Sequence, residues 1–349
     1  MRRVALPETA LVIGGVAAAI LVAAWFHAPD QAAGAWLAAF LFWIGLPVGA
    51  LFIVLAHALI GGAWIDPLRP ALAGMLRSLR LLAWCIAPVL LAAPQIYPWA
   101  RAGDGGWLDL RSFAARAVAY LAIWLAVAMV ARRHVLGEAT LPPARAWPAL
   151  IVLFLTTSLA ALDWIMSLEP HFVSTIFGMM VTAGWFSFAV ACAVASGAWR
   201  VGADAGERLD PLAQLLQASI ILWAYLAAVQ LIVIWESDLS AEIPWYLRRG
   251  AAGWEAAAIA LALLRFVVPF LLLLWQPLRR APAAVLIAAG AVMLGHLADT
   301  WWLTIPDYRQ PFRWVDPLAV VAIGGLLLFF IGRGPFLQPI RTLARPRHG

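Results

Sequence analysis

The sequence predicts an all-α protein that crosses a membrane about ten times. Hydrophobic residues make up 64% of its 349 residues and charged residues only 12%, and the mean hydropathy is +0.89. A soluble domain is about half apolar and about one-quarter charged. Apolar runs of about 20 residues, long enough to cross a hydrocarbon core of roughly 30 Å, recur along the whole chain. Composition and spacing together indicate a polytopic membrane protein.

Ten apolar runs have the length of a membrane-spanning helix. They centre on residues 10–27, 35–59, 79–97, 112–131, 147–166, 171–198, 211–235, 253–275, 283–304 and 316–332. The third run is the least regular because Pro88, Pro94 and Pro98 interrupt it, and nine helices are the alternative. The first run follows a basic start but lacks a small-residue cleavage site, so we expect it to remain as a membrane helix.

The placement of arginine predicts the orientation of the chain. All 24 basic residues are arginines, and short cytoplasmic loops are enriched in basic residues. If the N-terminus is cytoplasmic, sixteen arginines lie in loops on that side and six on the other. We therefore expect both termini in the cytoplasm. Because the arginines are scattered over short loops, they point to membrane lipid and not to a nucleic-acid partner.

Three landmarks recur at nearly one offset and predict an internal repeat. They are Gly62–Trp64 with Gly197–Trp199, Gln95 with Gln230, and Asp163–Pro170 with Asp299–Pro306, at offsets of 135, 135 and 136 residues. Each copy holds an even number of helices, so both copies enter the membrane in the same direction. The expected organisation is a first helix (residues 1–34), two parallel four-helix bundles (35–170 and 171–306) and a last helix with a basic cytoplasmic tail (307–349).

Titratable residues gather where the fifth span meets the sixth. Glu169 precedes Pro170, which disfavours helical geometry, so we expect the fifth helix to end there and the sixth to begin. This places His171 in the first turn of the sixth helix and Asp163 more than one turn inside the fifth. A carboxylate within a span is costly unless it is paired or used. Asp163, Glu169 and His171 are therefore candidates either for capping and interhelical bonds or for proton transfer.

A second set of charged residues lies in the eighth and ninth spans. Arg265 falls near the middle of the eighth span, and His296 and Asp299 lie one turn apart on the ninth. An arginine at that depth needs a counter-charge, which either Asp299 or Glu255 can supply. The set is consistent with a structural ion pair and also with a proton relay or a contact to quinone.

Several segments resemble the F-type membrane subunit of bacterial alternative complex III, a quinol:electron acceptor (cytochrome c) oxidoreductase. The matching segments are DWIMSLEPHFVSTIFG (163–178), AGWFSF (183–188), WAYLAAVQLIVIW (223–235), PWYLRR (244–249), FVVPFLLLL (266–274), HLADTWWL (296–303) and HALIGGAW (57–64). The resemblance runs from about residue 40 to about residue 305, and SLEPH is its most specific part. These subunits belong to the NrfD-like group, which is related to the membrane subunit of polysulfide reductase.

The resemblance implies ten helices in two four-helix bundles and a share in quinol handling or proton translocation. It places no redox cofactor on this chain and makes quinone the candidate ligand. Haem and iron–sulfur clusters are expected on partner subunits, namely an NrfD-like paralogue, a multihaem cytochrome and an iron–sulfur subunit. The resemblance also implies a place in the bacterial inner membrane. The chain departs from the family at residues 209–214, where the His-Asp-Leu-Gly-Lys motif is missing, and at Arg265, which replaces a histidine. Proton uptake from the cytoplasmic side therefore lacks its usual residues.

Two other functions stay open. A secondary transporter would share the repeats and the charges within the membrane, and would show helices broken near the midplane at corresponding positions of both halves. A b-type cytochrome would need histidine pairs at matched depth, and the six histidines form no such pair in the expected topology. Cys85 and Cys192 lie in apolar runs without metal-ligand spacing, which favours buried, inert thiols.

Cysteine-accessibility labelling tests the expected orientation. Single cysteines in a background without Cys85 and Cys192 should be labelled from outside at residues 102–108 and 239–244, and from inside at 202–207 and 335–349. Labelling of residues 239–244 and of the C-terminal tail from the same side would contradict the ten-helix arrangement.

Overall fold

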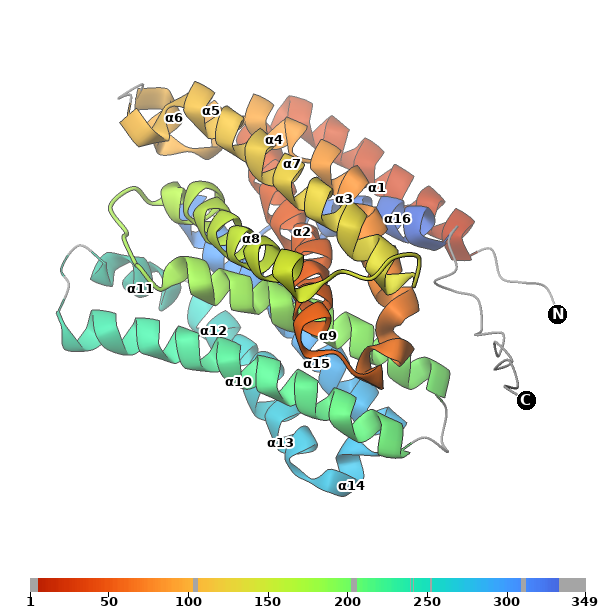
Figure 1. Ribbon diagram of the computed structural model, residues 1–349. Helices are drawn as coiled ribbons and strands as arrows, with labels where there is room; N and C mark the ends of the chain where they lie inside the picture. Colours follow the sequence, from red (N-terminus) through yellow and green to blue (C-terminus); the bar gives the residue numbers. More distant parts are fainter. Residues whose placement is uncertain are drawn as a thin grey trace, which may run out of the picture.

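The computed structural model describes residues 6–102, 106–201, 206–238, 240, 242–251, 253–308 and 312–332, and every regular element in them is helical. The main helices are α1 (Leu6–His27), α2 (Pro29–Ile60), α3 (Arg69–Trp84), α7 (Leu110–Val135), α8 (Pro143–Trp164), α9 (Phe177–Val201), α10 (Gly206–Glu236), α12 (Trp254–Ala262), α13 (Val268–Leu274), α15 (Pro282–Thr304) and α16 (Val315–Gly332). Figure 1 shows these helices running roughly alongside one another. The basic start (1–5) and the predicted basic tail (333–349) lie outside the described residues.

Short helices connect the long ones. They are the 3₁₀ helices η1 (Ala63–Leu68), η2 (Gly106–Leu108), η3 (Met166–Leu168) and η6 (Ile305–Tyr308), the α-helices α4 (Ala87–Leu91), α5 (Ala93–Ile96), α6 (Pro98–Ala102), α11 (Ile243–Arg249) and α14 (Gln276–Arg279), and the π-helix η5 (Leu263–Val267). The π-helix joins α12 to α13 within one span, Trp254–Leu274.

The described helices confirm an all-α, multi-pass membrane architecture. Nine helical stretches are long and apolar enough to cross a membrane, and α16 is a shorter apolar helix. With 18 residues, α16 is about 27 Å long, close to the roughly 30 Å of a hydrocarbon core. The nine-span and ten-span arrangements therefore differ in whether α16 crosses the membrane. The sequence had instead pointed to the proline-rich third run as the span in question.

The third span differs from its predicted bounds of 79–97. The apolar stretch in the structure is Ala63–Leu91, and the chain breaks at Cys85–Ile86 and again at Ala92. The short helices α4, α5 and α6 each begin with proline in the first or second position. Proline fits the first turn of a helix but cannot donate the hydrogen bond that continues one. The prolines thus start new short helices and shorten the span at its C-terminal end.

The sixth span also differs from its predicted start at residue 171. Residues Glu169–Ile176 form turns and irregular backbone, and α9 begins at Phe177. The buried Phe172 stacks on Trp245 with ring centroids 4.4 Å apart and meets Phe177 edge-on. This tertiary packing holds the segment outside the helix, so the prediction of His171 on the first turn of a helix was wrong.

The spans form two rings of four helices that pack against each other. The first ring consists of α2, α3, α7 and α8, and the second of α9, α10, the α12–α13 span and α15. Helices α2 and α9 pack on each other where the rings meet. They are the most buried spans, because 89% and 83% of the residues in their most apolar stretches are buried. Helices α1 and α16 pack together and against α2 (Figure 1). The origin of the two rings in a duplicated unit stays a prediction.

Two glycines allow the close approach of α2 and α9. A Cβ atom on Gly49 would lie 2.2 Å from the backbone oxygen of Trp185, and one on Gly45 would lie 2.5 Å from the Trp185 ring. Lipid gives no hydrophobic driving force for helix association, so close van der Waals contact at small residues has to supply it. The spacing of four residues between Gly45 and Gly49 places both on one face of α2.

Gly49→Ala should therefore destabilise the folded protein, because the added methyl group meets backbone that cannot rotate away. We expect a loss of about 1–3 kcal/mol, the usual cost of overpacking, measured as a lower melting temperature in detergent. Gly290→Ala, in α15, is the matched control because a Cβ there meets nothing within 4 Å. Equal melting temperatures for the two variants would contradict this account of the α2–α9 contact.

Candidate functional site

Asp163 lies buried near the C-terminal end of α8 and accepts four side-chain hydrogen bonds. Arg116 of α7 binds both carboxylate oxygens, at 2.8 and 2.9 Å, and the Tyr120 hydroxyl donates to Oδ2 at 2.9 Å. The indole of Trp107 donates to Oδ1 at 3.1 Å, and its ring also lies 4.2 Å from the Arg116 guanidinium carbon. Interhelical hydrogen bonds and an ion pair therefore satisfy this carboxylate, and His171 is not among its partners.

Arg116 is a site residue that the sequence reasoning missed. It lies inside the predicted fourth span, and so it belonged to neither loop when arginines were assigned to the two faces. An arginine inside an apolar run needs a buried or interfacial counter-charge. That rule, applied to Arg116 as it was to Arg265, would have indicated Asp163 or a residue at the same depth.

An ion-pair network covers the end of the second ring that the arginine bias predicts to lie outside, which we call the outer end. Arg248 binds Glu169 at 2.5 Å and approaches Asp307 to 3.6 Å, while Arg249 binds both oxygens of Asp307 at 3.0 and 2.7 Å. The Arg249 guanidinium also lies 3.5 Å from the Trp245 ring centroid and donates to the backbone oxygen of Trp302. Burial lowers the pKa of Arg249, against the opposing effect of Asp307, but arginine starts high enough to stay charged.

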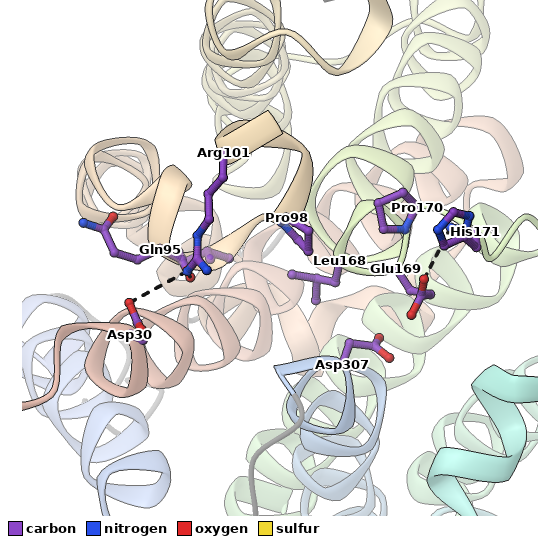
Figure 2. A pocket seen from close by; sticks show the side chains of 10 residues that line it. Asp30, Gln95, Pro98, Arg101, Leu168, Glu169, Pro170, His171 and Asp307 are labelled. Atoms are coloured by element: carbon purple, nitrogen blue, oxygen red, sulfur yellow. Dashed lines mark hydrogen bonds and ion pairs between the residues drawn. The ribbon is translucent and has the colours of Figure 1, made fainter. Parts of the chain in front are cut away.

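A polar cavity of about 550 Å³ opens beside this network (Figure 2). Its lining consists of Asp30, Gln95, Ile96, Pro98, Arg101, Leu168, Glu169, Pro170, His171 and Asp307. Figure 2 shows Glu169, His171 and Asp307 on one side, and Asp30 with Arg101 on the other. The backbone N–H of the exposed His171 donates to Glu169 at 3.4 Å. We name this space the outer cavity; it brings Glu169 and His171 together, as the sequence predicted.

Arg265 and Asp299 form a buried ion pair inside the second ring. The sequence had left Asp299 and Glu255 as alternatives, and Glu255 instead accepts from the backbone of Gly253 at the start of α12. Arg265 lies in the π-helix η5 and has no exposed surface. Cβ atoms on Gly184 and Gly295 would come within 2.7 Å of its side chain, so these two glycines provide the space it occupies.

The two aspartates are equivalent at the 136-residue offset, and each binds an arginine from the third span of its own ring. The arginines themselves are not equivalent, because Arg116 lies six residues after the start of α7, whereas Arg265 lies eleven residues after the start of α12. The first pair therefore lies near the outer end of its ring and the second lies deeper.

His296 is buried without a hydrogen-bond partner on either ring nitrogen. Its ring stacks on Phe188 and Phe42, with centroids 4.6 and 5.5 Å away. The Nε and Nη2 atoms of Arg265 also lack a partner, and its guanidinium lies 4.1 Å from the Trp223 ring centroid. Buried polar atoms are normally bonded to protein or to water. The free atoms of His296 and Arg265 are therefore suited to bind a ligand or water.

A second cavity, of about 430 Å³, lies between α10, α12 and α15. Its lining consists of Met180, Trp223, Ala224, Ala227, Ala228, Gln230, Leu231, Tyr246, Arg249, Gly250, Ala258, Leu261, Ala262, Phe266, Asp299 and Trp302. Asp299 belongs to this wall, whereas its partner Arg265 does not. We name this space the lateral cavity. It combines apolar walls with a few polar groups, the usual composition of a small-molecule site.

The Arg249–Asp307 pair lies between the two cavities. Arg249 lines the lateral cavity, and Asp307, which it binds through two hydrogen bonds, lines the outer cavity. One ion pair thus forms part of the partition between an apolar space and a polar one. Sequence reasoning did not find this partition, because Arg249 and Asp307 are 58 residues apart and each falls in a segment expected to be a loop.

The structure also brings together a histidine pair that the expected topology lacked. His57 and His134 approach to 3.2 Å between ring nitrogens. His134 Nδ1 accepts from the backbone of Leu141, so its Nε2 donates to His57, whose own Nε2 donates to Gly62. All four ring nitrogens are therefore bonded within the protein. Among the described residues, His, Cys, Asp and Glu form no group of three or more suited to a metal ion.

Comparison with known proteins adds no identification, because no protein-family model matches the chain and no curated protein matches it significantly.

Asp163→Asn should lower the stability of the protein, because it leaves the partly buried Arg116 without a counter-charge. Removing one partner of a buried pair costs about 3–5 kcal/mol, and we expect the lower part of that range since Arg116 is 17% exposed. Thermal melting in detergent measures the change. Asp66→Asn is the control, because Asp66 is 58% exposed in its pair with Arg69. A wild-type melting temperature together with altered proton coupling would assign Asp163 to proton transfer instead.

Proposed function

We propose that the chain is a membrane subunit of a respiratory quinol:electron acceptor oxidoreductase, and that it binds quinol in the lateral cavity with Asp299 as proton acceptor. The observation that carries this proposal is the position of the Asp299 carboxylate. It lies between the buried guanidinium of Arg265 and an apolar cavity of about 430 Å³. The resemblance of residues 163–178 and 296–303 to the F-type subunit supports the same assignment.

The chemistry of the lateral cavity suits a quinol. Apolar residues such as Ala227, Leu231 and Ala258 line most of the cavity and can receive an aromatic ring and an isoprenoid tail. Gln230 and Tyr246 are bonded to each other at 3.3 Å and supply hydrogen-bonding groups for a ring oxygen. Arg265 pairs with the Asp299 carboxylate, and an ionised carboxylate is the form that accepts a proton from a hydroxyl group.

Oxidation of a quinol releases two protons and two electrons. The proposal assigns the electrons to haem or iron–sulfur clusters on partner subunits, and assigns binding and proton transfer to this chain. Arg249 lines the same cavity as Asp299 and binds Asp307, which lines the outer cavity with Glu169 and His171. This arrangement supports release of protons on the outer side.

The alternative functions receive less support. Among the described spans, the third is broken at Cys85–Ile86, and the eighth changes to a π-helix at η5. Their counterparts at the predicted offset are α10 and α7, which run without interruption. A transporter of the repeat type would break corresponding helices in both halves. For a b-type cytochrome, His57 and His134 would first have to give up the hydrogen bonds that occupy all their ring nitrogens.

Filling the lateral cavity tests the proposal in the assembled complex. Ala227→Phe places a ring in the cavity and should raise KM for quinol by roughly tenfold or more, about 1.4 kcal/mol, with assembly retained. Ala218→Phe, at an exposed position of the same helix outside the cavity, is the matched control. In Ala227→Phe, photo-labelling of the chain by an azido-quinone should fall together with quinol turnover.

Asp299→Asn in the same assay separates proton transfer from binding. Loss of a general base lowers turnover by about 10²-fold or more, while azido-quinone labelling persists. Both are measured on complexes that assemble, because the variant leaves Arg265 without its counter-charge. Wild-type KM and labelling in Ala227→Phe would refute quinol binding in the lateral cavity. Labelling lost in Ala227→Phe but normal turnover in Asp299→Asn would refute the role of Asp299 alone.

A further inference from the structure

Three arginines from two helices meet at the end of α16 without a carboxylate partner. Arg77 and Arg80 come from α3, and Arg132 comes from α7. Arg80 and Arg132 lie close enough to Arg77 for their positive charges to oppose its own. Among the described residues, no Asp or Glu forms an ion pair with any of the three. The cluster therefore holds like charges together with no counter-charge from this part of the protein.

The contacts of Arg77 place the cluster at the edge of the hydrocarbon. Its Nη2 atom donates to the backbone oxygen of Ile331 at 3.5 Å, and its guanidinium lies 4.9 Å from the Phe330 ring centroid. Ile331 is the penultimate residue of α16, whose roughly 27 Å length is close to the thickness of the membrane core. Arg77 therefore lies where α16 leaves the membrane, on the face that the arginine bias predicts to be cytoplasmic.

Large apolar side chains continue from the cluster toward the membrane centre. Trp84 lies one turn beyond Arg80 on α3 and is 80% exposed; Met129 lies one turn before Arg132 on α7 and is 57% exposed. Helix α3 runs away from this face and α7 runs toward it, so each apolar residue lies deeper than the arginine that precedes or follows it on its own helix. Residues spaced by three or four share a helix face, and α3 packs on α7. The surface thus has a basic end and an apolar end, as a phospholipid does.

We infer that Arg77, Arg80 and Arg132 form a binding site for the phosphate headgroup of an anionic phospholipid, with acyl chains over Trp84 and Met129. The Nε of Arg132 is buried without a hydrogen-bond partner, and a phosphate oxygen supplies the acceptor that this group lacks. Guanidinium groups bind phosphate through paired hydrogen bonds. Basic pockets between membrane helices near the cytoplasmic surface bind lipid headgroups in this way. The site is separate from the lateral and outer cavities and does not depend on the proposed redox function.

Lipid titration of the full-length protein in detergent, followed by native mass spectrometry, tests the site. Phosphatidylglycerol should bind more tightly than phosphatidylcholine, and Arg80→Gln should reduce that preference by about fivefold, equivalent to about 1 kcal/mol per arginine. Arg80 is exposed, so this variant should fold normally. The triple change of Arg77, Arg80 and Arg132 to Gln should abolish the preference. Arg145→Gln, an exposed arginine at the start of α8, is the control and should leave the preference unchanged.

Two further measurements distinguish a lipid from a free ion. Trp84→Ala should weaken phosphatidylglycerol binding, because the acyl chains lose their apolar contact. Inorganic phosphate should compete only weakly. Strong competition by inorganic phosphate with no effect of Trp84→Ala would overturn the lipid assignment, and an unchanged lipid preference in Arg80→Gln would overturn the site.

Discussion

Hydrocarbon offers no partner to a charged side chain, and this constraint explains where the charges of the protein lie. Two arginines within the spans are each matched by an aspartate: Arg116 by Asp163 and Arg265 by Asp299. Both pairs join the third span of a ring to the fourth. Because removing either partner would leave a charge in a medium of low dielectric constant, the pairs fix which helices are neighbours. The outer pair of Arg249 and Asp307 does the same for the connections at the end of the second ring.

The two spanning pairs differ in how completely they are satisfied. Asp163 receives bonds from arginine, tyrosine and tryptophan, so its environment is that of a structural anchor. Around Arg265, several donors and both nitrogens of His296 are left without protein partners, and Asp299 reaches an apolar cavity. The two rings thus carry an arginine–aspartate pair each, with equivalent aspartates but different chemistry available to them. Of the two spanning pairs, only the one in the second ring has buried atoms without a protein partner.

Close packing makes this arrangement of charges feasible. Gly45 and Gly49 bring α2 and α9 together, and Gly184 and Gly295 make room for the Arg265 side chain. In a membrane, such contacts have to supply the association energy that the hydrophobic effect supplies in water. The π-helix at Arg265 adds one residue to a turn and is a local departure of the kind that recurs at functional sites. Glycines therefore shape both the helix contact at the centre of the fold and the candidate site.

The sequence by itself determined the solvent, the secondary structure and the approximate positions of the spans, because apolar length and composition depend only on local residues. It also indicated Asp163, Arg265 and Asp299, since a charge in an apolar run is visible without a structure. Tertiary structure alone decided the partners. Arg116 and Asp163, which bind each other, are 47 residues apart. The stacking of Phe172 on Trp245 keeps residues before Phe177 out of α9. The ion pair of Arg249 and Asp307 lies between the two cavities. These features depend on which helices pack together, and a helical pattern specifies the face of each helix but not the neighbour that covers it.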